Sequence, residues 1–126
     1  MMSVLAPTWV GSTREATSAG SYREEEATLV IVAGWFEVDP KERDAFVAER
    51  VASIHRSRSE PGCIEYVIAA DPADPARAVL FERWASEADL DAHLGRSGQT
   101  STDSPSVSPT GMSIVVYDIS GERALA

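Results

Sequence analysis

The sequence predicts an α+β domain in which two helices cover one face of an antiparallel sheet, in the chain order βαββαβ. Three observations support this prediction: four runs of β-branched and aromatic residues, two amphipathic stretches with helix start signals, and a short proline-rich turn between two strands. The 126 residues have room for one domain with a single core. A hydrophobic share of 44% and a charged share of 25% are typical of a globular protein.

Residues 1–27 are rich in Ser, Thr, Ala and Glu and keep no periodicity, so we expect a flexible N-terminal extension. Residues 28–39 follow as the first strand, in which apolar side chains occupy both alternating sets. A strand with two apolar faces is typical of the centre of a sheet. Gly34 within it predicts a bulge or the close approach of another segment, because glycine weakens a plain strand.

The stretch after this strand predicts one helix that ends at the Pro61-Gly62 pair. Asp39 is the expected N-cap, Pro40 suits the first helical position, and Glu42 occupies the capping-box position. The predicted apolar stripe of this helix consists of Val47, Val51 and Ile54.

Two further strands are expected from Cys63 to about Ala70 and from Arg77 to Ala85, and the short polar connection between them predicts a hairpin. In the first of them Tyr66 alternates with Ile64 and Ile68, so we expect all three side chains in one layer.

A short second helix is expected to begin after Ser86, an N-cap with Asp89 at the capping-box position. We expect it to end at His93 or Leu94, because Gly95 follows.

Residues 95–111 consist largely of Ser, Thr, Gly and Pro and predict a flexible loop, a lid or a spacer, that adds nothing to the core. Residues 112–120 read as the last strand, which completes a ferredoxin-like domain over residues 28–126. Since the helices leave one sheet face free, we expect a second copy of the chain to cover it in a homodimer.

Charge and cysteine content exclude several classes of partner. Twenty acidic against 11 basic residues give a net charge of -9, which repels nucleic acid and anionic membrane surfaces. Cys63 is the single cysteine, and neither a metal-ligand spacing nor a glycine-rich phosphate loop is present in the sequence. With no long apolar run and no basic leader before a short apolar stretch, we expect a cytoplasmic protein that uses no metal.

Two spacings in the order found here resemble the antibiotic biosynthesis monooxygenase family: E-P-G-C-x-x-Y, starting at Glu60, and E-x-W-x-S-x-x-x-L-x-x-H, from Glu82 to His93. The first strand and its capped helix complete the resemblance, which spans about residues 28–123. It implies a dimeric α+β barrel with a pocket between sheet and helices in each subunit. Relatives include cofactor-free oxygenases of anthrones and quinols, haem-degrading enzymes and an isomerase of a signalling sugar. Fold alone therefore does not decide the reaction.

The candidate catalytic residues are His93, Trp84 and Tyr66. Oxygen reacts slowly with closed-shell molecules, so a cofactor-free oxygenase must form an electron-rich phenolate or enolate and exclude water from it. His93 is the expected base because imidazole titrates near neutrality, although a histidine at a helix end also serves as a cap. Trp84, at a position where the resemblance implies a functional tryptophan, and Tyr66 would supply aromatic walls and donors, or simply core.

The candidate substrate-binding residues are Trp35, Phe36 and Glu82. Trp35 and Phe36 flank Gly34 and are expected at the pocket mouth or the dimer seam. Glu82 shares the face of Trp84, where an unpaired carboxylate would be costly, so a structural pairing is the favoured interpretation and a site role the second one.

We predict a cofactor-independent monooxygenase of a small aromatic polyphenol or quinol, with molecular oxygen as co-substrate. Haem-degrading relatives carry an asparagine on the first strand that this chain lacks, so haem is disfavoured. Two alternatives stay open: a non-catalytic dimeric module that binds a small ligand or serves in a stress response, and an isomerase of a small metabolite. An apolar cavity at Trp84 and His93 would favour the enzyme, and a filled core the module.

Overall fold

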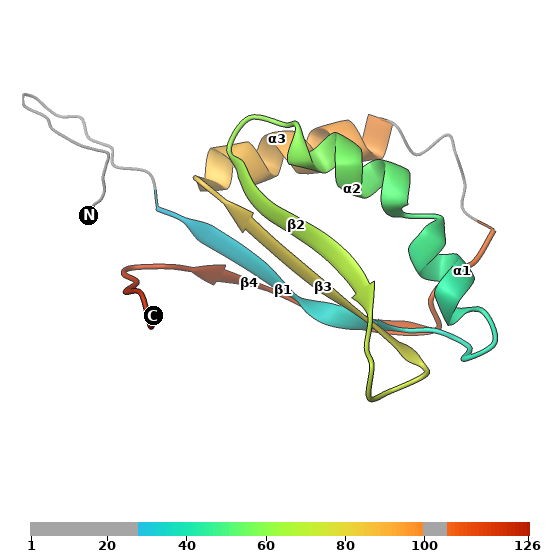
Figure 1. Ribbon diagram of the computed structural model, residues 1–126. Helices are drawn as coiled ribbons and strands as arrows, with labels where there is room; N and C mark the ends of the chain where they lie inside the picture. The colour runs from blue at the N-terminus through green and yellow to red at the C-terminus, as the bar shows by residue number, and fades with distance from the viewer. Residues whose placement is uncertain (1–27, 100–105) are drawn as a thin grey trace, which may run out of the picture.

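The computed structural model describes residues 28–99 and 106–126, which form one four-stranded antiparallel sheet with helices on one face (Figure 1). The predicted N-terminal extension lies outside the described residues. The strands are β1 (Val30–Glu37), β2 (Cys63–Ala70), β3 (Arg77–Trp84) and β4 (Gly111–Asp118). The helices are α1 (Arg43–Ala48), α2 (Val51–Arg58) and α3 (Glu87–Gln99). The predicted ferredoxin-like α+β fold is confirmed, with the first helix divided in two.

The strand order β2-β3-β1-β4 puts β1 and β3 in the centre of the sheet and β4 at one edge. On β1 and β3 the even-numbered side chains face the helices and form the core, because strand residues alternate between faces. Val30, Ala78 and Trp84 are fully buried there. No helix in the described part of the chain is long and apolar enough to cross a membrane.

Gly34 accommodates the neighbouring strand β4. A Cβ atom at Gly34 would lie 1.9 Å from the carbonyl oxygen of Ser113 and 2.8 Å from Cα of Ile114. The pairing of β1 with β4 runs without a register shift, so of the two predicted explanations the close approach is correct and the bulge is not.

The prediction of one continuous helix after β1 is wrong. Asp39 caps a turn instead, since its Oδ1 accepts a hydrogen bond from the backbone nitrogen of Lys41 at 2.9 Å, and α1 begins only at Arg43. The helix breaks at Glu49 and Arg50, whose side chains bind the segment before β4. The tertiary contacts of these two polar side chains therefore interrupt the helix that the apolar stripe predicts.

The last helix is longer than predicted, because α3 continues through Gly95 and Gly98 to Gln99. A glycine inside a helix costs about 1 kcal/mol relative to alanine but does not end the helix by itself. Contacts hold the extra turns here: Arg96 forms an ion pair with Glu60, and Ser97 contacts His93.

The prediction that the loop over 95–111 adds nothing to the core is also wrong. Val107 is buried in the core cluster. Its backbone nitrogen donates to Oε1 of Glu49 at 3.1 Å, and its carbonyl oxygen accepts from the Arg50 guanidinium at 3.3 Å. The composition of the stretch does not predict this contact, because Val107 is an apolar residue among polar neighbours.

A register shift lies in β2 between Cys63 and Glu65. Because a shift of one residue exchanges the two faces of a strand, Ile64 is exposed while Tyr66 and Ile68 are buried. The expectation that Ile64 shares a layer with Tyr66 is therefore wrong.

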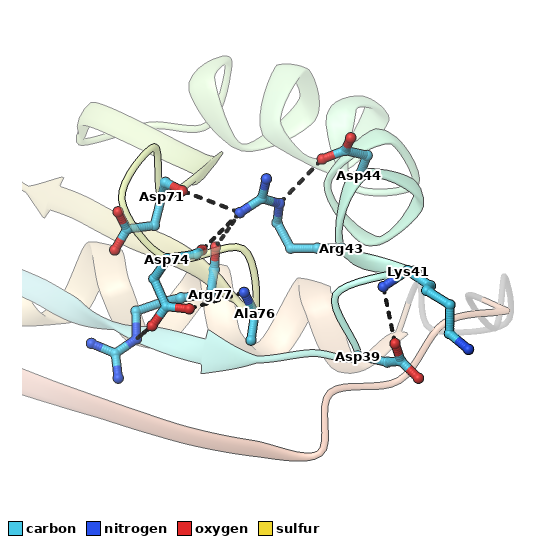
Figure 2. Close-up of polar contacts among 8 residues, drawn as sticks. All are labelled: Asp39, Lys41, Arg43, Asp44, Asp71, Asp74, Ala76 and Arg77. Atoms are coloured by element: carbon cyan, nitrogen blue, oxygen red, sulfur yellow. Dashed lines mark hydrogen bonds and ion pairs between the residues drawn. The ribbon is translucent and has the colours of Figure 1, made fainter.

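The turn between β2 and β3 is fastened by one arginine of α1. Nη1 of Arg43 donates to the carbonyl oxygens of Asp71, Asp74 and Arg77 at 3.2, 2.9 and 3.2 Å (Figure 2). The predicted hairpin is confirmed, and this hub fixes its closed end.

Candidate functional site

The open end of the hairpin carries Glu82 and Trp84 on the face of β3 that the helices cover. Nε1 of Trp84 donates a hydrogen bond to Oε1 of Glu82 at 2.8 Å. The two residues share a face, as predicted, and the buried carboxylate finds its partner in the indole two residues away.

His93 projects from α3 onto the same place. Its ring centroid lies 4.8 Å from that of Trp84 and 5.4 Å from that of Tyr66 on β2. Only 5% of His93 is exposed. The structure thus brings together all three residues that were predicted to be catalytic, with Glu82 beside them.

Glu60 completes this group, and the sequence analysis missed its role. It lies between α2 and β2, and its Oε1 is 2.8 Å from Nδ1 of His93 and 3.0 Å from Nη1 of Arg96. The signal for it in the sequence is a carboxylate directly before the Pro61-Gly62 turn, within the E-P-G-C-x-x-Y spacing. We call Glu60, Tyr66, Glu82, Trp84 and His93 the buried cluster.

Burial dominates the electrostatics of Glu82. Desolvation raises the pKa of its carboxyl group, the hydrogen bond from Trp84 and the proximity of His93 lower it, and the charge of Glu60 raises it. The net direction is upward, so Glu82 keeps its proton to a higher pH than an ordinary carboxyl group does.

Tyr66 is held as a neutral phenol. Burial and the charge of Glu82 raise its pKa to about 12, against the lowering effect of hydrogen bonds with Ser57 and Ser53. At neutral pH its hydroxyl is therefore a hydrogen-bond donor or acceptor and not a base. Its backbone oxygen accepts from Nε of Arg58 at 2.7 Å, which fastens β2 to α2.

Cys63 stands at the edge of the buried cluster and is partly buried. Desolvation and the charges of Glu60 and Glu82 raise the pKa of its thiol, so the unreactive protonated form is favoured.

Two predicted substrate-binding residues lie elsewhere. Trp35 points to the face without helices, where the Arg77 guanidinium lies 4.2 Å from its ring centroid. Phe36 is on the helix face but packs against Phe46, with ring centroids 5.2 Å apart. It pairs with Ala78, six residues before Trp84 on β3, which is roughly 20 Å along a strand.

An open cleft of about 500 Å³ lies at the start of α3. Its lining residues are Thr28, Val30, Ser86, Glu87, Ala88 and Asp118. None of them belongs to the buried cluster. Among the described residues, no group of three or more His, Cys, Asp or Glu side chains is arranged to hold a metal ion.

Comparison with known proteins gives one family. The family described as "Antibiotic biosynthesis monooxygenase" matches residues 29–101. A curated relative, the uncharacterized protein sll1783 of Synechocystis, is 39% identical over 65 residues, which are 52% of this chain and 44% of that protein. The match thus spans less than half the length of that relative.

Solved structures agree with the fold. The structure of Rv0793 from Mycobacterium tuberculosis is 28% identical, with a TM-score of 0.62 over 76% of this chain and 99% of that one. Protein SO0527 from Shewanella oneidensis is 20% identical, with a TM-score of 0.63 over 73% and 91% of the two chains. The second likeness concerns the fold alone.

Proposed function

The chain belongs to the antibiotic biosynthesis monooxygenase family, and from this premise we propose that it is a cofactor-independent monooxygenase of a small aromatic polyphenol or quinol. The observation that carries the proposal is the position of His93, whose ring packs against both Trp84 and Tyr66 while one of its nitrogens contacts Glu60. A base with aromatic neighbours suits a flat phenolic substrate.

In the proposed reaction, Nε2 of His93 removes a proton from the substrate. The resulting phenolate or enolate gives one electron to molecular oxygen, and recombination of the two radicals forms a carbon–oxygen bond. Cleavage of the oxygen–oxygen bond then leaves one oxygen atom in the product and releases the other as water. Both atoms are reduced by electrons from the substrate, which loses two hydrogens, so the proposal requires no flavin, haem or metal.

The remaining groups fit supporting roles. Glu82, whose pKa burial raises, can donate to a peroxide oxygen when it is protonated, and the neutral hydroxyl of Tyr66 can orient a substrate oxygen. Trp84 is fully buried and walls the site from water.

Nε2 of His93 faces the C-terminal turns of α3. Oγ of Ser97 lies 3.4 Å from this nitrogen, one turn later in a stretch that contains Gly95 and Gly98. Glycine makes a helix easier to unwind. We therefore place the substrate entrance at the C-terminal turns of α3.

The proposal includes a cytoplasmic homodimer. Val115 and Tyr117 of β4 are about half exposed on the face of the sheet without helices, and Val79 of β3 is partly exposed there too. A second copy would remove this apolar surface from water.

A second candidate is a non-catalytic module that binds a small ligand or serves in a stress response. The packing of the buried cluster favours it, because Tyr66, Trp84 and His93 are at most 8% exposed in this structure. Such a protein would use the same fold without turnover.

Oxygen uptake separates the two candidates. Purified protein, treated with a chelator and dialysed, is incubated with a panel of anthrones and quinols, and oxygen is followed with an electrode. Uptake above the rate of buffer with at least one substrate supports the monooxygenase. Binding of panel compounds without uptake supports the module, and conversion of a substrate without oxygen consumption supports an isomerase.

A further inference from the structure

Glu60 is fixed on both sides. Its backbone nitrogen donates to the Ser57 carbonyl at 3.0 Å, and its own carbonyl accepts from the Cys63 nitrogen at 3.2 Å. After it the chain turns at Gly62, whose φ of 81° lies in the left-handed region. A Cβ at Gly62 would lie 2.2 Å from the Asp89 carboxyl group, so α3 packs directly on this turn. Glu60 therefore enters the buried cluster from a rigid position.

The carboxylate of Glu60 contacts a single ring nitrogen of His93. Oε1 is 2.8 Å from Nδ1, and the two side chains are 9% and 6% exposed. Arg96 forms an ion pair with the same oxygen at 3.0 Å. Since an ionised carboxylate only accepts hydrogen bonds, the ring nitrogen that faces it must carry the proton. In a neutral imidazole the lone pair then lies on Nε2.

Two aromatic side chains pack against the ring and hinder a half-turn that would exchange its two nitrogens. Trp84 lies along one side with an interplanar angle of 34°, and Tyr66 meets the ring edge-on at 61°. A half-turn of the imidazole would have to pass these two side chains. The other carboxylate of the buried cluster, Glu82, is bonded to Trp84.

We propose that Glu60 is the positioning residue of this site, selecting the tautomer of His93 that carries its proton on Nδ1 and presents a basic Nε2 toward the C-terminal turns of α3. This inference rests on the proposed function for its catalytic consequence, but the tautomer itself is a property of the resting protein. A partner of this kind orients a functional histidine without contacting the substrate.

The test is an NMR measurement of the full chain with ¹⁵N-labelled histidine, at a pH where the ¹⁵N shifts themselves show neutral imidazole rings. Two-bond ¹H–¹⁵N correlations show which nitrogen carries the proton. His55, the other histidine of the chain, is exposed on α2 and serves as the internal reference. We expect His93 in the Nδ1–H form, whereas a free imidazole prefers Nε2–H. A proton on Nε2 of His93 in the wild type would overturn the proposal.

Two variants sharpen the test. Glu60→Met keeps the length of the side chain but removes the acceptor, so the Nδ1–H preference should be lost. Glu60→Gln retains an acceptor oxygen but adds an NH2 donor that can bind an unprotonated Nδ1, so it should keep only part of the preference. Glu65→Gln on β2, where the carboxylate pairs with Arg83 at the surface, is the matched control and should leave His93 unchanged. An unchanged tautomer in Glu60→Met contradicts the proposal. If that variant does not fold, the wild type decides, because Nε2–H in the wild type overturns the proposal.

Turnover gives a separate readout. With a substrate from the oxygen-uptake panel, Glu60→Met should lower kcat about 10–100-fold with a smaller change in KM, and Glu60→Gln should restore part of the loss. The predicted tautomers without any oxygen uptake would refute the proposed function and leave the role of Glu60 intact. Oxygen uptake with the wrong tautomer would refute the role of Glu60 alone.

Discussion

The two ends of β3 use buried polar side chains in opposite ways. At its start, one guanidinium nitrogen of Arg43 donates hydrogen bonds to three backbone carbonyls of the turn between β2 and β3 (Figure 2). Near its end, titratable side chains contact one another and the core. His93 pairs with Glu60, and Glu82 accepts a hydrogen bond from Trp84. A cation that satisfies backbone carbonyls is fixed in one protonation state, whereas a cluster of titratable groups can exchange protons. We therefore assign stability to the first end and chemistry to the second.

The largest expected effect concerns chemistry at the second end. His93→Gln should lower kcat with an active quinol or anthrone about 10²–10⁴-fold, because the general base is lost. Oxygen uptake at saturating substrate measures it. His55→Gln, a matched change at an exposed histidine of α2, should retain full activity. Equal activity of both variants would remove His93 from the mechanism.

The next effect concerns stability at the first end. Arg43→Met should lower the free energy of unfolding by about 2–3 kcal/mol, because three carbonyl oxygens lose a charged donor. Urea denaturation followed by circular dichroism measures it, and Lys41→Met is the control, since only the backbone nitrogen of Lys41 binds Asp39. Activity per folded molecule should stay within about twofold of the wild type, because distant sites act independently. A large loss of kcat in folded Arg43→Met would break the division between the two ends.

A smaller loss of stability is expected from a change at Trp84, which is both a core side chain and the hydrogen-bond donor to Glu82. Trp84→Phe keeps an aromatic ring but removes the donor to Glu82, so it should cost about 1–2 kcal/mol. The same hydrogen bond lowers the pKa of Glu82. Its loss should therefore raise that pKa further and make the stability deficit smaller in acid than at neutral pH. Trp35→Phe, on the opposite face, should show no such pH dependence, and urea titrations at several pH values compare them.

The smallest effect is a difference in pH dependence. Burial raises the pKa of Glu82 above its ordinary value near 4.5, so the folded state binds more protons than the unfolded state between the two pKa values. The stability contributed by protonated Glu82 is thus present below the unfolded pKa and is lost as pH rises through the folded pKa. Glu82→Gln, which stays neutral, should gain stability relative to the wild type over this window. Glu65→Gln should show no such gain. If the stability of the two variants depended on pH in the same way, this would contradict the raised pKa of Glu82.

Much of the fold could be predicted from the sequence because its signals are local. Cys63–Ala70 was predicted as a strand with its observed bounds, and Ser86 with Asp89 marked the start of α3 through a capping interaction that the structure contains. The break at Glu49 and Arg50 and the burial of Val107 could not be predicted, since they depend on contacts between segments more than 50 residues apart.

The candidate site was predictable to a similar extent. Alternation along one strand placed Glu82 and Trp84 on one face, and the sequence placed His93 at the end of the helix that follows them; its burial beside Trp84 was seen only in the structure. Glu60 was missed because its role depends on a contact with α3, 33 residues later. Aromatic character alone does not say which face of a two-sided strand meets the helices, and the structure puts Trp35 on the face without helices, where the dimer seam is predicted.

The central claim is that the buried cluster inserts an oxygen atom into a phenolic substrate with His93 as the base. Reaction under ¹⁸O₂, with the product analysed by mass spectrometry after a short incubation, tests it most directly. We predict one ¹⁸O atom per product molecule with the wild type and almost no labelled product with His93→Gln in the same time. Product without label, or equal labelled product from both proteins, would contradict the claim.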